Sequence, residues 1–229
     1  MLPARGPRSL ALALGETDDS LKPPPTRGRT MATTEPDPLA NPGTADRVAA
    51  AFGVFTVVVS LGGIASAIAL STRFSFATDA LSDLGRATWR SSTAFNTGLL
   101  VSGLCALVPG VVLVRNSRTL LHVAGSLAFS LSAVCLALIG VFALPAPQHG
   151  TVAVGFFLGF TVAFVCYGAG DVRSGARRWG LFAIGLAAVH VGGWAVWIAA
   201  GTPGGLALPE IVGSGCVSAW ILGTAVRLW

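Results

Sequence analysis

Six long apolar segments fill most of the chain between residues 45 and 229, and they sharply limit the folds open to it. A helix needs about 20 apolar residues to cross a bilayer. Inside hydrocarbon, every backbone N–H and C=O group must find a partner within the protein, which for a single segment means an α-helix. The sequence therefore predicts an all-α fold, a polytopic transmembrane bundle with six spanning helices.

The expected spans are separated by short connections rich in Pro, Gly and Arg. Only 11% of the residues are charged, whereas soluble domains carry roughly 25%. No soluble catalytic domain fits between such closely spaced segments. The predicted spans are, in order, Arg47–Ser71, Thr93–Val114, Leu120–Leu144, Thr151–Gly170, Gly180–Ala200 and Pro209–Val226.

Residues 1–44 differ from the rest of the chain, because they are rich in Pro, Thr and charged residues. A segment of this composition cannot bury a hydrophobic core. We therefore expect two regions: a disordered cytoplasmic tail over residues 1–44 and a six-helix transmembrane domain over residues 45–229. Met31 is an alternative start of translation, in which case the start codon was set wrongly and the first thirty residues are not translated.

The arginines near the span ends predict the orientation. Positive residues accumulate on the cytoplasmic side of membrane proteins. We therefore expect both termini in the cytoplasm of a multi-pass protein of the cell (plasma) membrane. The same distribution accounts for the net charge of +5, so no nucleic-acid partner is expected. Seven arginines share the side of the termini and three lie opposite: Arg47, Arg115, Arg118, Arg173, Arg177, Arg178 and Arg227, against Arg73, Arg86 and Arg90.

The first outer connection, residues 72–92, is the longest of the five. Thr78 is placed to cap a short helix, with Asp79 and Ser82 in its first turn and Gly85 as its stop. Apolar residues beside this helix give it a surface that can be buried against the spans. We expect an ordered loop, packed on the mouth of the bundle.

Five polar residues lie near the outer ends of the spans and form the candidate site: Asp79, Asp83, Asn96, His149 and Glu210. Three of them have a simple structural explanation. A turn suits Asp83, an interfacial hydrogen bond suits His149, and a helix N-terminus favours a charged Glu210. Ionisable groups at a membrane site are nevertheless functional candidates. We therefore hypothesise that these residues converge on one outer-face pocket.

The remaining histidines and cysteines carry weaker signals. His190 lies in the middle of the fifth span, either as a neutral imidazole bonded to a neighbouring helix or as a proton relay. His122 is interpreted as a polar group at the end of a helix. No ligand spacing indicates a metal, so we expect neither metal nor cofactor. The cysteines are interpreted as small apolar residues: Cys105, Cys135, Cys166 and Cys216.

Small residues recur every four positions in three spans, which predicts close helix packing rather than a pore lining. No internal repeat is visible, and this weakens the case for an inverted-repeat transporter. The small residues are Gly98, Ser102, Ala106 and Gly110; Gly155 and Gly159; and Gly215, Ala219 and Gly223.

Several short motifs lie along the chain: Ala-Leu-Ser-Asp-Leu-Gly at 80–85, Phe-Asn-Thr-Gly at 95–98, Gly-Val-Phe at 140–142 with Pro145, His149 and Phe156-Phe157, and Glu210 with Trp220. They resemble the motifs of domain-of-unknown-function family 998, which comprises six-span membrane proteins of bacteria and archaea. The resemblance covers residues 48–228 and implies the same topology, but it implies no activity. Ala143 and Leu144 separate a Phe-Pro pair that is usual in the family.

Three functions remain open at this point. The first is a non-enzymatic integral membrane protein whose polar outer pocket binds a lipid headgroup, a small ligand or a partner protein. The second is a membrane-embedded hydrolase or transferase that uses His149 and the outer carboxylates. The third is a small transporter with His190 as its mid-membrane polar group. Membrane lipids are the only partners common to all three.

Overall fold

The computed structural model describes residues 43–202 and 204–229, so the predicted tail lies almost entirely outside the described residues. The described chain forms six long α-helices and one short 3-10 helix. All six α-helices are long and apolar enough to cross a membrane. This confirms the predicted fold class. The elements are α1 (Thr44–Leu70), η2 (Leu81–Gly85), α2 (Ser92–Arg115), α3 (Leu120–Val141), α4 (Gln148–Arg173), α5 (Arg177–Ala199) and α6 (Ala207–Leu228).

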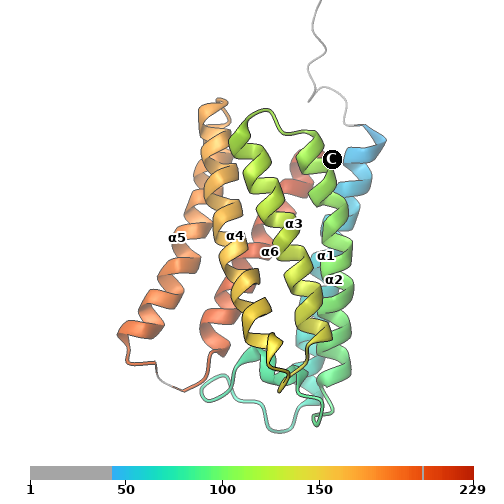
Figure 1. The fold of residues 1–229 in the computed structure, drawn as a ribbon, viewed down its shortest axis with the longest axis vertical. Coiled ribbons are helices and arrows are strands. Elements are labelled where there is room, and N and C mark those ends of the chain that lie inside the picture. Colours follow the sequence, from blue (N-terminus) through green and yellow to red (C-terminus); the bar gives the residue numbers. More distant parts are fainter. Residues whose placement is uncertain (1–42, 203) are drawn as a thin grey trace, which may run out of the picture. The chain divides into compact units, whose positions relative to one another are not determined.

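The helices run alternately up and down, and each packs against the next along the chain (Figure 1). α6 packs against both α5 and α1, so the six helices close into a ring. One end of the bundle holds the α1–α2, α3–α4 and α5–α6 connections and is called the loop end. The opposite end, where α1 begins and α6 ends, is called the terminal end.

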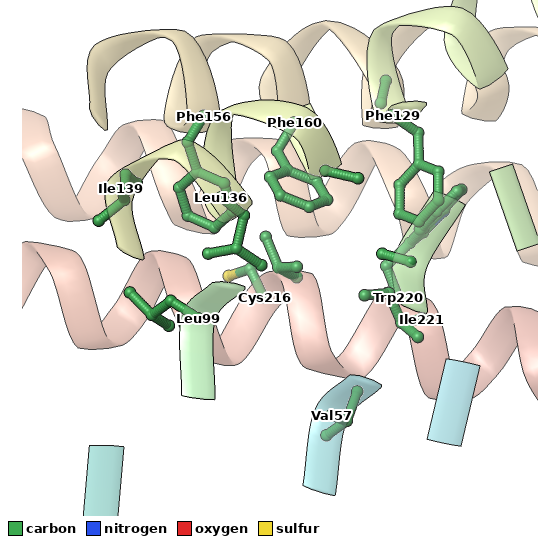
Figure 2. Packing of buried hydrophobic residues seen from close by; sticks show 14 of the residues in the cluster. Val57, Leu99, Phe129, Leu136, Ile139, Phe156, Phe160, Cys216, Trp220 and Ile221 are labelled. Atoms are coloured by element: carbon green, nitrogen blue, oxygen red, sulfur yellow. The ribbon is translucent and has the colours of Figure 1, made fainter. Parts of the chain in front are cut away.

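Aromatic side chains fill the middle of the ring. The ring centroid of Trp220 on α6 lies 5.3 Å from Phe129 on α3 and 5.8 Å from Phe164 on α4. Figure 2 shows Phe156 and Phe160 reaching from α4 toward α6 beside this cluster. Tilted and edge-to-face arrangements of this kind are favourable beyond the area that they bury.

The outer surface of the bundle is apolar as well. Val58, Leu158 and Val196 are more than half exposed, and they lie on three different helices. A belt of exposed aliphatic side chains is unfavourable in water but matches the hydrocarbon of a bilayer. Each helix is therefore apolar on its inner and outer faces alike.

Glycines allow α4 and α5 to touch near the terminal end. A Cβ added to Gly168 would lie 2.8 Å from the Gly180 carbonyl oxygen, so only glycine fits at this crossing. Toward the loop end the two helices move apart (Figure 1). The crossing therefore acts as the apex of a wedge between α4 and α5.

Candidate functional site

A loop of residues 71–91 crosses the loop end of the bundle and carries η2. Leu84 is fully buried among the helices. The Ser91 hydroxyl donates to the Leu84 carbonyl oxygen at 2.7 Å, and Asn96 Nδ2 donates to the Gly85 carbonyl oxygen at 2.9 Å. These contacts confirm the expectation of an ordered loop packed on the mouth of the bundle.

The short helix begins later than predicted, and Thr78 does not cap it. Asp79 belongs to a separate preceding turn, where its carboxylate accepts a hydrogen bond from the Ser75 amide at 2.8 Å. η2 starts directly after Ala80, whose amide donates to the Asp83 carboxylate at 2.8 Å. A charged carboxylate is a stronger acceptor than a threonine hydroxyl, which explains why the aspartates decide where the turn and the helix begin.

Glu210 lies in the first turn of α6 and is only 7% exposed. Its carboxylate accepts a hydrogen bond of 2.6 Å from the backbone amide of Leu81, the first residue of η2. A buried carboxylate is costly unless hydrogen bonds compensate it. This bond joins α6 to the loop, across 129 positions of sequence.

His149 lies in the first turn of α4 and is only 4% exposed. Its Nδ1 lies 2.7 Å from the Phe142 carbonyl oxygen. Because a carbonyl only accepts, Nδ1 carries the proton, and in the neutral ring Nε2 is an acceptor. Nε2 is buried and has no hydrogen-bond partner among the described residues. Such an atom needs an explanation, and a bound ligand or water is one.

A cavity of about 710 Å³ lies between the loop-end halves of α4 and α5, beneath η2. Small-molecule sites measure roughly 300–1,000 Å³. Its polar lining gathers at the loop end, where Asp83, Arg86, His149 and Glu210 meet it. Its deeper walls are mainly apolar and include Ala153, Val154, Phe157, Leu158, Val191 and Trp194. The cavity is thus amphipathic, with charges at one end only.

A second, smaller cavity of about 60 Å³ lies inside the ring, between α1, α2, α3, α4 and α6. Ser82, His149 and Glu210 line both cavities. Thr56, whose buried hydroxyl also lacks a partner among the described residues, lines the inner one. The two spaces therefore adjoin at His149 and Glu210.

The structure brings together three of the five candidate residues. Asp83, His149 and Glu210 line the larger cavity. Asp79 and Asn96 hold the loop instead, through bonds to Ser75 and Gly85. The proposed single site of five residues is thereby reduced to a geometric core of three, and its function stays a hypothesis.

His190, at the inner end of the larger cavity, is fully hydrogen-bonded. Trp194 Nε1 can only donate, so His190 Nε2 accepts at 3.1 Å and Nδ1 carries the proton. Nδ1 lies 3.1 Å from Thr161 Oγ1, and the Thr161 hydroxyl donates to the Phe157 carbonyl oxygen at 3.0 Å. This chain of bonds describes a neutral imidazole linking α5 to α4.

A polar cluster at the terminal end was missed in the sequence. Asp171 is buried in α4, and both its oxygens accept from the Arg227 guanidinium, at 2.6 and 3.1 Å. His122 Nε2 lies 3.3 Å from the same carboxylate, and Thr119 Oγ1 lies 3.1 Å from His122 Nδ1. The available signal was an aspartate directly after the predicted fourth span, two residues before Arg173.

Among residues 43–202 and 204–229, no group of three or more His, Cys, Asp or Glu side chains is arranged to hold a metal ion. The larger cavity offers hydrogen-bonding groups and a guanidinium at its polar end. Its chemistry suits recognition of a polar group attached to an apolar body.

Six apolar helices around an aromatic core define a multi-pass α-helical integral membrane protein. The chain belongs to the DUF998 family of proteins of unknown function, whose model matches residues 47–227. The resemblance noted in the sequence is thereby confirmed. No curated protein and no solved structure matches the chain.

The motifs that suggested the family meet at the loop end. Gly85 of the first motif is bonded to Asn96 of the second. Phe142 of the third is bonded to His149. The first residue of η2 is bonded to Glu210 of the last. Short motifs far apart in sequence therefore build one assembly around the cavity.

Proposed function

We propose that this protein is a non-enzymatic membrane protein that binds one amphiphilic molecule, a lipid, in the cavity between α4 and α5. The observation that carries the proposal is the polarity of that cavity. The charged groups lie at the loop end, and the rest is lined mainly by apolar side chains, with Thr161, His190 and Trp194 hydrogen-bonded to one another at the inner end. A lipid has the same division between its headgroup and its chains.

The cavity also opens sideways toward the bilayer. Val154 and Leu158 of α4 and Val191 of α5 line it, and all three are more than half exposed on the outer surface. A lipid can therefore enter between the two helices without leaving the membrane. The Gly168–Gly180 crossing and the His190 hydrogen bonds close the wedge at its inner end.

Native mass spectrometry of the purified full chain, with identification of bound lipids, tests this proposal. Gly150 lines the cavity, and a Cβ added there meets no atom within 4 Å. Gly150→Phe should therefore leave the backbone undisturbed while its ring fills the cavity. We expect the wild-type protein to carry a bound lipid and the variant to lose it.

Gly185→Phe is the matched control, because Gly185 is an exposed helical glycine whose Cβ position is equally open. It lies on α5 outside the cavity lining. This variant should keep the lipid. A wild-type protein without bound lipid, or equal retention by both variants, would refute the proposal.

A second candidate, a membrane-embedded hydrolase or transferase, is favoured by one observation. His149 holds its proton on Nδ1, and its Nε2, which has no partner among the described residues, is the unprotonated nitrogen that a general base needs. Incubating the protein with defined lipids and analysing the products tests it. A product whose formation is lost in His149→Gln would make the bound lipid a substrate; unchanged lipids support binding alone.

The finer topology is part of the proposal. The terminal end carries more arginines near the helix ends than the loop end, which supports a cytoplasmic terminal end. The polar end of the cavity then faces the outer leaflet of the cell membrane. A small-transporter role is the least supported, because both ring nitrogens of His190 are already hydrogen-bonded.

A further inference from the structure

We infer that the lipid headgroup recognised at the loop end is a primary amine linked to a phosphate, as in an ethanolamine phospholipid. This inference rests on the proposed lipid binding and specifies its ligand. Three features of the groups that line the polar end of the cavity point to this headgroup.

The first observation is the unpartnered nitrogen of His149. With Nδ1 committed to the Phe142 carbonyl, Nε2 of the neutral ring has a lone pair and no partner among the described residues, and the His149 side chain lines the cavity. An occupant that donates a hydrogen bond satisfies this buried atom. A headgroup without a hydrogen-bond donor leaves the lone pair without a partner, and its binding affinity is lower as a result.

The second observation is the carboxylate beside it. Glu210 lines the same cavity and accepts one bond from Leu81. A carboxylate has about four lone-pair sites, so further donors can be accommodated. An ammonium group carries three donors and a positive charge. It can bind His149 and Glu210 together, and its charge balances the buried carboxylate.

The third observation is the guanidinium at the rim. Arg86 Nε donates to Asp83 at 2.7 Å, which fixes the guanidinium along the cavity edge. Its two terminal nitrogens carry four further N–H donors, the type of group that holds a phosphate. The two acceptors in the interior of the cavity therefore suit the ammonium group. The guanidinium at the rim suits the phosphate to which the ammonium is linked.

The experiment measures binding of the full chain, in nanodiscs or detergent, to lipids with identical acyl chains. The series runs from phosphatidylethanolamine through its N-methyl and N,N-dimethyl derivatives to phosphatidylcholine. Each step replaces one N–H donor of the ammonium group and keeps its charge. We expect affinity to fall along this series, with phosphatidylcholine weaker by about tenfold or more, since an unsatisfied buried acceptor is costly. Phosphatidylglycerol, which has hydroxyl donors but no ammonium, should also bind more weakly.

His149→Phe should show a smaller fall in affinity along the series, because it removes one of the two acceptors that distinguish these lipids and leaves Glu210 in place. His122→Phe, a matched change at the terminal end, should keep the wild-type order. The wild-type series needs no substitution, so it decides the question even if a variant fails to fold. Equal affinity for all headgroups would overturn this inference but leave lipid binding standing. Absence of binding by every lipid would overturn both.

Discussion

Gly85 illustrates how tightly single residues define the loop end. A Cβ added to Gly85 would collide with the Asn96 side-chain oxygen and would lie 2.8 Å from the Phe95 ring. The backbone of η2 therefore lies directly on the first turn of α2. Because Asn96 also binds the Gly85 carbonyl, a shift of either residue breaks the contact that holds the loop.

We therefore expect Gly85→Ala to destabilise the protein by about 1–3 kcal/mol, the usual cost of inserting a methyl group into a packed site. The thermal unfolding midpoint of the detergent-solubilised protein measures this. Gly185→Ala is the control, because its Cβ position is open and alanine favours a helix. Equal midpoints for the two variants would contradict the tight contact described here.

The buried residues also mark the limit of what the sequence predicted. Asp83, His149 and Glu210 were expected to converge, and they do line one cavity. Asp79 and Asn96 were grouped with them because they share a membrane depth. The depth of a residue in the bilayer does not determine the direction in which its side chain points around the bundle. Local hydrogen bonds hold these two side chains against the loop.

Among the helices, α5 is joined to its neighbours differently at its two ends. Near the terminal end its glycine touches α4 directly, whereas farther along the His190 hydrogen bonds and the contacts of Phe157 with His190 and Trp194 bridge the two helices. These bonds lie where the wedge between α4 and α5 begins to open. They therefore set both the width of the cavity and the stability of its inner end.

Thr161→Val removes the partner of His190 Nδ1 while preserving the shape of the side chain. A buried donor left unsatisfied costs about 1–3 kcal/mol, so we expect destabilisation of this size. Thr151→Val, at an exposed threonine of the same helix, should have little effect. The double variant Thr161→Val/His190→Phe should be less destabilised than the sum of its single changes, and strict additivity would contradict the bond.

At the terminal end, Asp171 joins α4 to α3 and α6 through His122 and Arg227. Removing one partner of a buried ion pair typically costs about 3–5 kcal/mol, although the partly exposed Arg227 lowers this figure. Asp171→Asn and Arg227→Met should each lower the unfolding midpoint. Their combination should be destabilised by less than the sum, with a coupling of about 1 kcal/mol or more. Additive effects would show that the pair contributes nothing.

Helix positions were predictable, but contacts between helices were only partly so. All six spans begin and end within about one turn of the predicted residues, because hydrophobic length and punctuation determine them. Gly98 packs closely on α1, as the small-residue spacing predicted. Gly215 has the same spacing, but a Cβ added to it would meet no atom within 4 Å. A repeat of small residues does not say whether a partner helix lies opposite.

At the scale of the whole molecule, the two ends of the bundle have different chemistry. At the loop end, the loop of residues 71–91 is tied to the residues before α6, since the Gly205 amide donates to the Ala77 carbonyl oxygen at 3.2 Å. The terminal end instead carries the Asp171 cluster and most of the arginines near the helix ends. This asymmetry is the physical basis for assigning a direction across the membrane.

We predict that the terminal end faces the cytoplasm. Reporter fusions after Arg118, Ala176 and the C-terminus should read inside, and fusions after Ala146 and Gly204 should read outside, because arginines beside the spans resist translocation. Inserted arginines in the α3–α4 connection are the control, since they reduce the asymmetry and should lower the fraction in the predicted orientation. An outside C-terminus would place the polar end of the cavity toward the cytoplasm and reassign its ligand to the inner leaflet.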